Sequence, residues 1–257
     1  MQLTVAILAC DNEVEIADCL DSVSWADERY VILDTRSTDQ TEVIARKMGA
    51  KVDRHPFTNF ASQRNFALES AQRDWLFFLD SDERATQELA SEIKRVTAGE
   101  NAQVGWWVPR YNYIWGAVVK HGGWYPDYQL RLIKRGHGNY DPTRQVHEVV
   151  MLDGPEGYLE QPIIHYNYAT VGQFIRKQRQ YVALEADIRY KQGIRPKPWT
   201  FLSLPLREFY RRYVRLQGYR DGWRGLVLCA LAAYYYGFMV TLLLTRKIAT
   251  HIDSNAS

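Results

Sequence analysis

Short apolar runs alternate with amphipathic stretches over the first hundred residues of the chain. Most of these runs contain no charged residue, which is typical of strands buried on both faces of a sheet. The expected strands lie at residues 3–9, 30–33, 51–53 and 75–79. The expected helices, with apolar positions at helical spacing, lie at residues 14–23, 37–48, 60–71 and 86–97. This alternation predicts a mostly parallel central sheet in a three-layer α/β domain.

The pattern changes after residue 100. Aromatic and polar residues alternate from Gly105 to Ile114, as they do in an antiparallel strand. Glycines and a proline predict a loop at residues 121–127. Further strands are expected at residues 118–120, 129–134, 146–150 and 163–166.

The last third of the chain is expected to be helical, with an amphipathic helix at 173–190, a basic helix at 207–216 and a loop at 218–225. Residues 226–245 contain no charge and are about long enough to span a bilayer. This segment fits a buried helix of the domain, a single membrane span, or a helix lying in the membrane interface. Three tyrosines at its centre disfavour the span, because tyrosine prefers the interface, and the basic neighbours favour the in-plane helix.

Charge is unevenly distributed, although the net charge of the 257 residues is only +2. Residues 171–224 hold 13 Lys or Arg and four Asp or Glu, a net charge of +9, so the remainder carries −7. A basic segment of this size indicates an anionic partner, either a membrane surface or a nucleic acid. The three cysteines have no metal-binding spacing, which predicts buried thiols in a reducing compartment, and no signal peptide is expected.

Carboxylates follow three of the predicted strands. Asp11 and Glu13 come after the first strand, Asp34 after the second, and Asp80 and Asp82 after the fourth. The carboxyl ends of parallel strands meet at one edge of a sheet, where open α/β sheets bind ligands. Carboxylates gathered there repel one another unless a cation or a donor-rich ligand lies between them. Asp80 and Asp82 therefore predict a hard divalent cation that also binds substrate phosphates, although the two could instead cap the following helix.

The sequence contains neither a Gly-x-Gly-x-x-Gly nor a Walker A pattern. This argues against a dinucleotide-dependent dehydrogenase and against a P-loop enzyme. Without a glycine-rich cradle for phosphate, the metal becomes the more necessary means of holding it.

In their order along the chain, the motifs resemble those of family-2 inverting glycosyltransferases with the GT-A fold. The motifs that carry this resemblance are Asp11-Asn12-Glu13, Leu33 to Thr41, Gln63-Arg64-Asn65, and Asp80 to Glu83. Three further motifs are similar to the subgroup that includes lipopolysaccharide-core glucosyltransferases: Gly122 to Asp127, Gln129 to Leu132, and Val146 to Glu148. The resemblance covers roughly the first 170 residues, and it departs from the usual family pattern at Asp11, Arg36 and Gln40.

The resemblance implies a Rossmann-like GT-A catalytic domain at 1–170, with a nucleotide-sugar half at about 1–100 and an acceptor half at about 101–170. Residues 171–257 would form a helical, membrane-associating region. The implied enzyme moves a sugar from a UDP-linked donor to a glycolipid or lipid-linked saccharide in cell-envelope polysaccharide or lipopolysaccharide synthesis. It would use Mg²⁺ or Mn²⁺, lie in the cytoplasm at the inner face of the cell membrane, and bind no nucleic acid.

The resemblance also assigns roles to individual residues. The assigned residues are Glu13, Asp34, Asp39, Arg64 and Asp80 for the nucleotide sugar, Asp80 and Asp82 for the metal, Glu148 and then Asp127 for the general base, and Trp124, Tyr125 and Arg131 for the acceptor. A carboxylate base takes the proton of the acceptor hydroxyl as the sugar carbon is attacked from the opposite face.

Other interpretations stay open on the sequence. A polyprenyl-phosphate sugar transferase of the same fold fits the same motifs, whereas a nucleotidyltransferase is disfavoured because residues 8–14 contain no glycine. A non-catalytic membrane or nucleic-acid binding module would explain the basic third but gives the acids no purpose. Individually, Glu13 fits an acid in the first turn of a helix, Arg64 a surface ion pair, and Glu148 a solvated strand residue.

Overall fold

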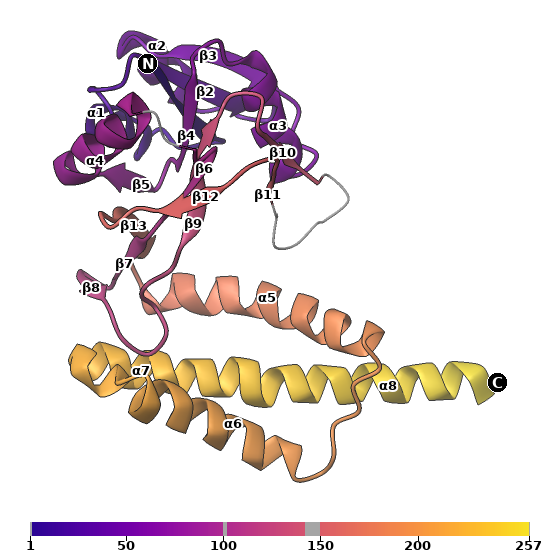
Figure 1. Ribbon diagram of the computed structural model, residues 1–257. Coiled ribbons are helices and arrows are strands. Elements are labelled where there is room, and N and C mark those ends of the chain that lie inside the picture. Colours follow the sequence, from indigo (N-terminus) through magenta and orange to yellow (C-terminus); the bar gives the residue numbers. More distant parts are fainter. Residues whose placement is uncertain (1, 100–101, 142–149, 257) are drawn as a thin grey trace. The chain divides into compact units, whose positions relative to one another are not determined.

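A seven-stranded sheet forms the centre of the first of two units in the computed structural model, which describes residues 2–99, 102–141 and 150–256 (Figure 1). This unit comprises Met1–Tyr111 and Asp127–Tyr166. Its strands, in their order across the sheet, are β12 (Glu156–Tyr158), β6 (Gly105–Val108), β9 (Gln129–Lys134), β4 (Trp75–Asp80), β1 (Leu3–Ala9), β2 (Glu28–Asp34) and β3 (Lys51–His55). Only β9 runs antiparallel to its neighbours in this described sheet, so the predicted mostly parallel sheet is confirmed.

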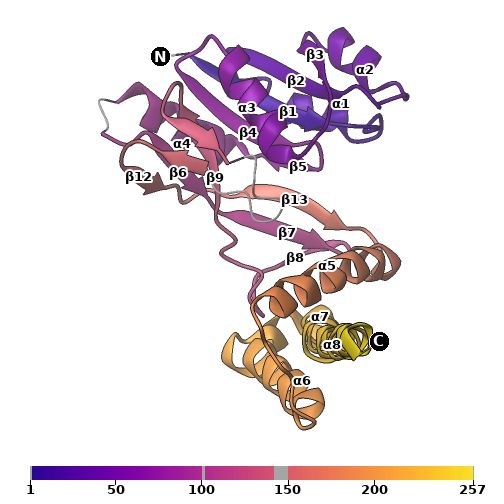
Figure 2. The same cartoon turned by 90° about the vertical axis from the view of Figure 1, so that its right-hand side faces the viewer.

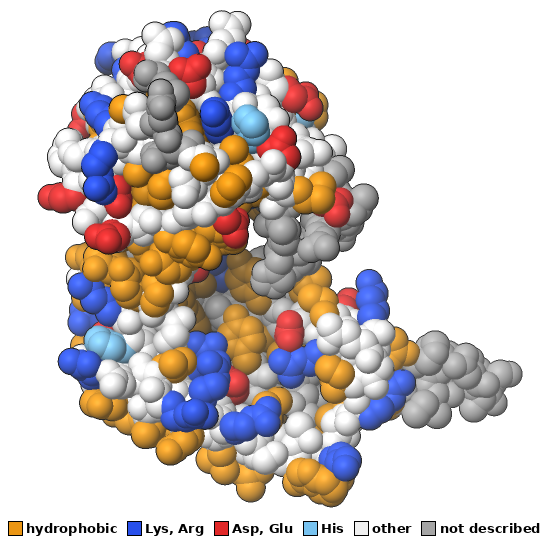
Figure 3. Space-filling view, in the orientation of Figure 1, with side chains coloured by type: hydrophobic (Ala, Val, Ile, Leu, Met, Phe, Trp, Pro, Cys, Tyr) orange, Lys and Arg blue, Asp and Glu red, His pale blue; other side chains and the backbone are white. Residues whose placement is uncertain are grey.

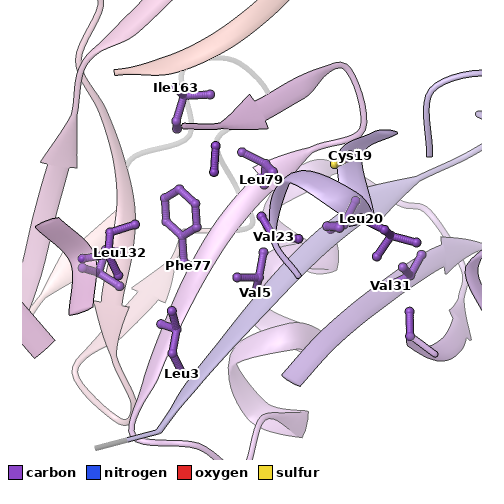
Figure 4. Packing of buried hydrophobic residues seen from close by; sticks show 14 of the residues in the cluster. Leu3, Val5, Cys19, Leu20, Val23, Val31, Phe77, Leu79, Leu132 and Ile163 are labelled. Atoms are coloured by element: carbon purple, nitrogen blue, oxygen red, sulfur yellow. The ribbon is translucent and has the colours of Figure 1, made fainter. Parts of the chain in front are cut away.

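Helices cover both faces of this sheet, as the three-layer prediction requires. Successive side chains of a strand point to opposite faces, so alternate residues of each buried strand enter two different cores. On one face Val5, Val31 and Phe77 pack against α1 (Ile16–Ser22), as Figure 4 shows. The other helices of the unit are α2 (Thr41–Lys47) and α4 (Gln87–Ala98) on that same face, and α3 (Phe60–Ser70) on the opposite face.

The strand order creates a topological switch beside β1. The chain passes from β1 outward to β2 and β3, and then returns to place β4 on the other side of β1. Sheets of this kind bind ligands outside the carboxyl ends of the strands at the switch. The residues that follow β1 and β4 there are 10–13 and 81–83, so the fold gathers the predicted acids at the expected edge.

Further strands of the unit lie outside or at the rim of the large sheet. They are β5 (Glu83–Ala85), which pairs with β13 (Ile163–Tyr168), and β10 (Gly138–Tyr140), which pairs with β11 (Val150–Leu152). The sequence pattern did not indicate β5. Because β5 intervenes, the helix after Asp82 begins at Gln87, where the Thr86 side chain accepts from the backbone N–H of Leu89. The interpretation of Asp80 and Asp82 as caps of that helix is therefore wrong.

Proline breaks the strand predicted over residues 105–114. Pro109 has no N–H to donate to a ladder, and the segment divides there into β6 and β7 (Arg110–Ile114). Among the cysteines, Cys19 and Cys229 are buried thiols as predicted, but Cys10 is exposed because it follows the last residue of β1. The predicted strand at 146–150 lies outside the described residues except for Val150.

The second unit comprises Asn112–Pro126 and Asn167–Ser257, so it includes the predicted loop at 121–127 up to Pro126. Within it β7 pairs with β8 (Ala117–Val119) from Asn112 onward. Its helical segments are α5 (Val171–Lys191), α6 (Thr200–Tyr210), η1 (Arg211–Arg215), η2 (Gly218–Asp221), α7 (Gly222–Ala232), η3 (Ala233–Met239) and α8 (Val240–Ala256). Figure 2 views α7 and α8 almost end-on beside α5 and α6.

The uncharged segment 226–245 forms the inner helix of this second unit. Leu228, Tyr235 and Val240 pack against Phe174 and Val182 of α5. Within the described residues, one helical run, Gly218–Thr250, is long and apolar enough to cross a membrane, and 44% of its apolar window is buried inside the structure. The loop expected at 218–225 is helical instead, because η2 spans Gly218–Asp221 and α7 begins at Gly222.

Candidate active site

Two loops at the switch edge are joined by hydrogen bonds between their side chains and backbones. Asp11, in the left-handed region with φ of 51°, accepts from the N–H groups of Thr38 and Asp39 at 2.9 and 3.3 Å. Asp39 in turn accepts from the N–H of Glu13 at 2.8 Å, and Glu13 accepts from the N–H of Gln40 at 3.0 Å. Glu13 therefore binds the neighbouring loop and precedes α1, rather than sitting in its first turn.

Asp34 ends β2 as a buried carboxylate that faces its own loop. Its Oδ2 accepts from Nε and Nη2 of Arg36 at 2.9 and 2.6 Å, and its Oδ1 accepts from the Arg36 N–H at 3.0 Å. These hydrogen bonds hold the pKa of Asp34 below its usual value, so the group is an anion at neutral pH. The Arg36 side chain is exposed and its guanidinium lies 5.2 Å from the ring centroid of Phe57.

Asp80, the last residue of β4, lies between two arginines. Arg131 of β9 donates to its Oδ2 at 2.6 Å, and Nη2 of Arg64 on α3 lies 3.5 Å from its Oδ1. Side chains along β4 alternate between the two faces of the sheet, so Asp80 points to the same face as Phe78, which α3 covers. This brings Asp80 close to Arg64. Burial opposes ionisation of Asp80, but the charges of Arg131 and Arg64 outweigh it and lower its pKa.

Glu83 extends these contacts into a network of alternating charges. Its carboxylate is fully buried and lies 2.9 Å from Nη2 of Arg131 and 3.2 Å from Nη1 of Arg110. Arg110 also donates twice to Oδ2 of Asp127, at 2.9 and 2.6 Å. Because three arginines alternate with three carboxylates, each buried charge has an opposite neighbour, which is the condition for keeping charges in a protein interior.

Asp82 is the more exposed of the two candidate metal ligands, at 38%, and its Oδ2 lies 3.4 Å from Nε2 of His165 on β13. Its backbone carbonyl accepts from the N–H of Tyr166, so β13 fixes the turn that carries it. Among the described residues, no three His, Cys, Asp or Glu side chains form a complete metal site. A cation bound there needs further ligands from a substrate, which is how Mg²⁺ is usually bound beside phosphates.

The remaining predicted residues are distributed as follows. Arg131, expected at the acceptor, is 4% exposed and pairs with Asp80 and Glu83 instead of reaching a surface. Trp124 and Tyr125 belong to the second unit, where both are half-buried, and the Trp124 ring packs edge-on against Tyr168. Glu148 lies outside the described residues.

The sequence interpretation did not identify Glu83, Arg110 and His165 as members of this cluster. A signal was available for Arg110 and His165, since each is a polar residue with apolar or aromatic neighbours in an expected strand. Glu83 lies between Asp82 and Arg84 and offered no such signal. Glu83 and His165 are opposite each other in the β5–β13 ladder, a pairing across 82 residues of sequence that no local pattern indicates.

Comparison with known proteins agrees with this architecture. Residues 4–147 match the family model described as Glycosyl transferase family 2. A relative from Rhizobium meliloti, named lipopolysaccharide core biosynthesis glycosyltransferase LpsC, is 29% identical over 91% of this chain and 89% of its own.

Solved structures also resemble the chain. A crystal structure of a mycobacterial protein covers 78% of this chain and 77% of its own at 16% identity and a TM-score of 0.46. The glucosyl-3-phosphoglycerate synthase of Mycobacterium tuberculosis, crystallised with Mn²⁺, UDP and phosphoglyceric acid, is 22% identical over 43% of each chain, with a TM-score of 0.37. Since the family match extends over more than half of its residues and the sheet has the expected topology, the chain belongs to glycosyl transferase family 2.

Proposed function

We propose that this glycosyltransferase moves a sugar, with inversion, from a UDP-linked donor to a lipid-linked saccharide of the lipopolysaccharide core. Residues 1–170 would carry the catalytic function, with the donor bound mainly by residues 1–100, and residues 171–257 would hold the enzyme at the cytoplasmic face of the membrane. Family membership supports the transfer reaction, and the relative named for lipopolysaccharide core biosynthesis supports the acceptor class.

The observation that carries the proposal is the position of Asp34 and Asp80 across the topological switch. In the ladders Leu8 is opposite both Ile32 and Asp80, so Asp34 lies two strands away and two residues further along. With strand spacings near 4.8 Å and 3.3 Å per residue, their Cα atoms are roughly 12 Å apart on the same face. This spacing suits an elongated ligand with hydrogen-bond donors at one end and negative charge at the other, as in a nucleoside diphosphate sugar.

The residues around Asp82 fit a divalent metal by their chemistry. Asp80 stays ionised, Asp82 presents a partly exposed carboxylate, and His165 lies beside it with an imidazole nitrogen. Carboxylate oxygens suit Mg²⁺ or Mn²⁺, with diphosphate oxygens completing the coordination. When bound, such an ion would act as a Lewis acid on the leaving diphosphate.

The neighbouring side chains would hold the donor in place. Asp34 would accept hydrogen bonds from the nucleobase, after the exposed Arg36 side chain turns aside. Asp80 would lie by the ribose and the metal, kept ionised and oriented by Arg64 and Arg131. Arg131 is thus better explained as a positioning residue for Asp80 than as a contact to the acceptor.

Inversion needs one base to take the proton of the acceptor hydroxyl while its oxygen attacks the anomeric carbon and the bond to diphosphate breaks. Glu148 remains our candidate. Asp127 is less suited, since Arg110 and Gln129 donate hydrogen bonds to both of its oxygens. The substitution Glu148→Gln should then lower kcat by about 100-fold or more, whereas Asp127→Asn should lower it much less.

The test is transfer of radiolabelled sugar from a panel of nucleotide sugars, with Mg²⁺ or Mn²⁺, into extracted lipopolysaccharide or polyprenyl phosphate. We expect Asp82→Asn to lower the rate by on the order of 100-fold or more. Glu42→Gln, a surface carboxylate on α2, serves as the matched control. Equal rates for the wild type and Asp82→Asn would refute the proposal, and transfer only to polyprenyl phosphate would change its acceptor.

A further inference from the structure

Exposed apolar side chains are concentrated in one part of the second unit. More than half of the large hydrophobic side chains that are exposed among the described residues lie between Ile194 and Phe238, under a fifth of the chain. Single exposed apolar residues are ordinary, but a concentration of this size marks a surface that meets a partner. Over α6 and its neighbours, Figure 3 shows these side chains among lysines and arginines.

Helix α6, its N-cap residue and the following helical segment η1 carry the clearest part of this surface, which we name the α6 stripe. Its residues are Trp199, Leu202, Leu206, Tyr210 and Val214, with exposures of 64, 68, 59, 57 and 46%. Their spacing of three or four residues places them on one face of the helix. No residue of α6 itself is buried, which is unusual for a helix with so many apolar residues.

The opposite side of α6 packs within its own unit. The Phe201 ring contacts the Phe238 ring, with centroids 6.0 Å apart. Pro205 lies so close to Gly237 that a Cβ on the glycine would meet the Pro205 Cα at 2.6 Å. These contacts fix α6 on η3, so the α6 stripe points away from the helices that hold it.

Positive charge surrounds the stripe. Residues 194–238 contain eight Lys or Arg and two acids, a net charge of +6. Both acids are already paired: Glu208 with Arg211 and Arg212, and Asp221 with His121. The field around the stripe is therefore positive, which selects an anionic partner.

The uncharged segment 226–245 is less suited to contact lipid on all sides. Its Leu228, Tyr235 and Val240 belong to the core of the unit, and its outward positions recur at Leu226, Tyr234 and Phe238. A membrane span would require the helices packed around it to separate or to enter the bilayer with it. A helix with one apolar face and basic flanks instead lies in the plane of the interface.

We infer that the α6 stripe docks on an anionic lipid surface, with the helix axis parallel to the membrane. Its leucines would enter the boundary between headgroups and acyl chains, Trp199 and Tyr210 would lie at headgroup depth, and the arginines would contact lipid phosphates. This inference rests on the proposed function, in which the acceptor is carried by a lipid, and it names the part of the chain that meets the membrane.

The docking surface is connected to the loop with the predicted acceptor residues. Arg212 donates to the carbonyl of Gly122 at 3.0 Å, and the N–H of Gly122 donates to the Leu216 carbonyl at 2.8 Å. The backbone N–H of His121 donates to Oδ2 of Asp221 at 2.7 Å, and Nδ1 of the His121 ring lies 2.9 Å from Oδ1 of Asp221. Docking of the stripe would therefore hold this loop beside the lipid surface from which the acceptor is taken.

Co-sedimentation of the full chain with vesicles tests the inference. Wild type should sediment with vesicles containing phosphatidylglycerol and much less with pure phosphatidylcholine. Leu202→Glu with Leu206→Glu should lower the partition coefficient by on the order of 100-fold, because two apolar contacts are lost and two like charges added. Arg207→Gln with Arg215→Gln should lower it by roughly 10-fold or more, at about 1 kcal/mol per charge.

The matched control is Val43→Glu on α2, since Val43 is as exposed as Leu206 but belongs to the first unit. It should sediment like the wild type. Circular dichroism and Mn²⁺-dependent UDP binding, measured on every variant, separate docking from folding and from donor binding. If the wild type does not bind UDP, the proposed function is overturned, and the sedimentation result still stands as a test of docking.

Two results would overturn the docking inference. One is sedimentation of the double leucine variant as complete as that of the wild type. The other is a wild-type dimer in light scattering, without vesicles, that the same variant converts to a monomer, because the stripe would then be an interface between two copies.

Discussion

Glu83 offers the sharpest test of the charge network in the candidate active site. Substitution of Glu83→Gln keeps the shape of a fully buried side chain but removes the negative charge that lies 2.9 Å from Arg131 and 3.2 Å from Arg110. Removing one partner of a buried ion pair costs about 3–5 kcal/mol, because the other charge stays buried. Arg131 keeps Asp80 and Arg110 keeps Asp127, so we expect about 3 kcal/mol.

A thermal melt measures this loss of stability as a change in Tm. In a chain of this size, 1 kcal/mol shifts Tm by about 2–4 °C, so Glu83→Gln should lower Tm by about 6–12 °C. Glu42→Gln is the matched control, since Glu42 also pairs with two arginines, Arg46 and Arg54, but at the surface. Surface pairs are worth under about 1 kcal/mol, so its Tm should fall by only a few degrees.

The double variant Glu83→Gln with Arg131→Gln measures whether the two charges act on each other. Groups in one buried network show coupling energies of about 0.5–3 kcal/mol, and we expect a value near the upper end for a pair that is almost fully buried. Equal Tm shifts for Glu83→Gln and Glu42→Gln, with additive effects in the double variant, would refute the reasoning.

Three further predictions follow from the contacts. Asp34→Asn should weaken UDP binding by about 10- to 100-fold in calorimetry, since a charged hydrogen-bond acceptor for the uracil ring is lost. Unchanged affinity would show that Asp34 does not bind the nucleobase. Chelation with EDTA should abolish transfer and added Mn²⁺ should restore it, whereas full activity in EDTA would show that no divalent metal is needed. Gly237→Ala should destabilise the chain by about 1–3 kcal/mol in denaturant melts, because its Cβ would overlap Pro205, while Gly172→Ala, which meets no backbone atom, should be close to neutral.

Much of the first unit follows from local sequence. A run such as Trp75 to Leu79 has no polar position, so it has to be covered on both faces, and helices of matching period lie on either side of it. The acids at strand ends then share one edge because parallel strands all point the same way. Both conclusions needed only the period of the apolar residues and the position where each run stops.

The partners of those acids did not follow from the sequence. Asp80 meets Arg64 and Arg131, 16 and 51 residues along the chain, because α3 covers one face of β4 and β9 pairs with it. Those contacts depend on the order of the strands, which the pattern alone leaves open. The resemblance assigns Arg131 to the acceptor, but the antiparallel pairing of β9 with β4 places its side chain in the interior.

The second unit shows what composition alone cannot predict. Composition correctly indicated an uncharged segment with basic neighbours, but composition does not say which side of a helix is covered. Only the packing of α6 and α5 against η3 shows that one side of 226–245 is covered within the unit and that the neighbouring α6 stripe is an outward apolar face.

The central claim is that Asp80 and Asp82 hold the diphosphate end of a nucleotide sugar through a divalent cation. A crystal grown with UDP and Mn²⁺, with data collected at the manganese absorption edge, tests it most directly. We predict an anomalous peak in contact with the Asp82 carboxylate and the UDP phosphates, with the uracil ring at Asp34. A manganese peak elsewhere, or UDP bound away from β1 and β4, would contradict it.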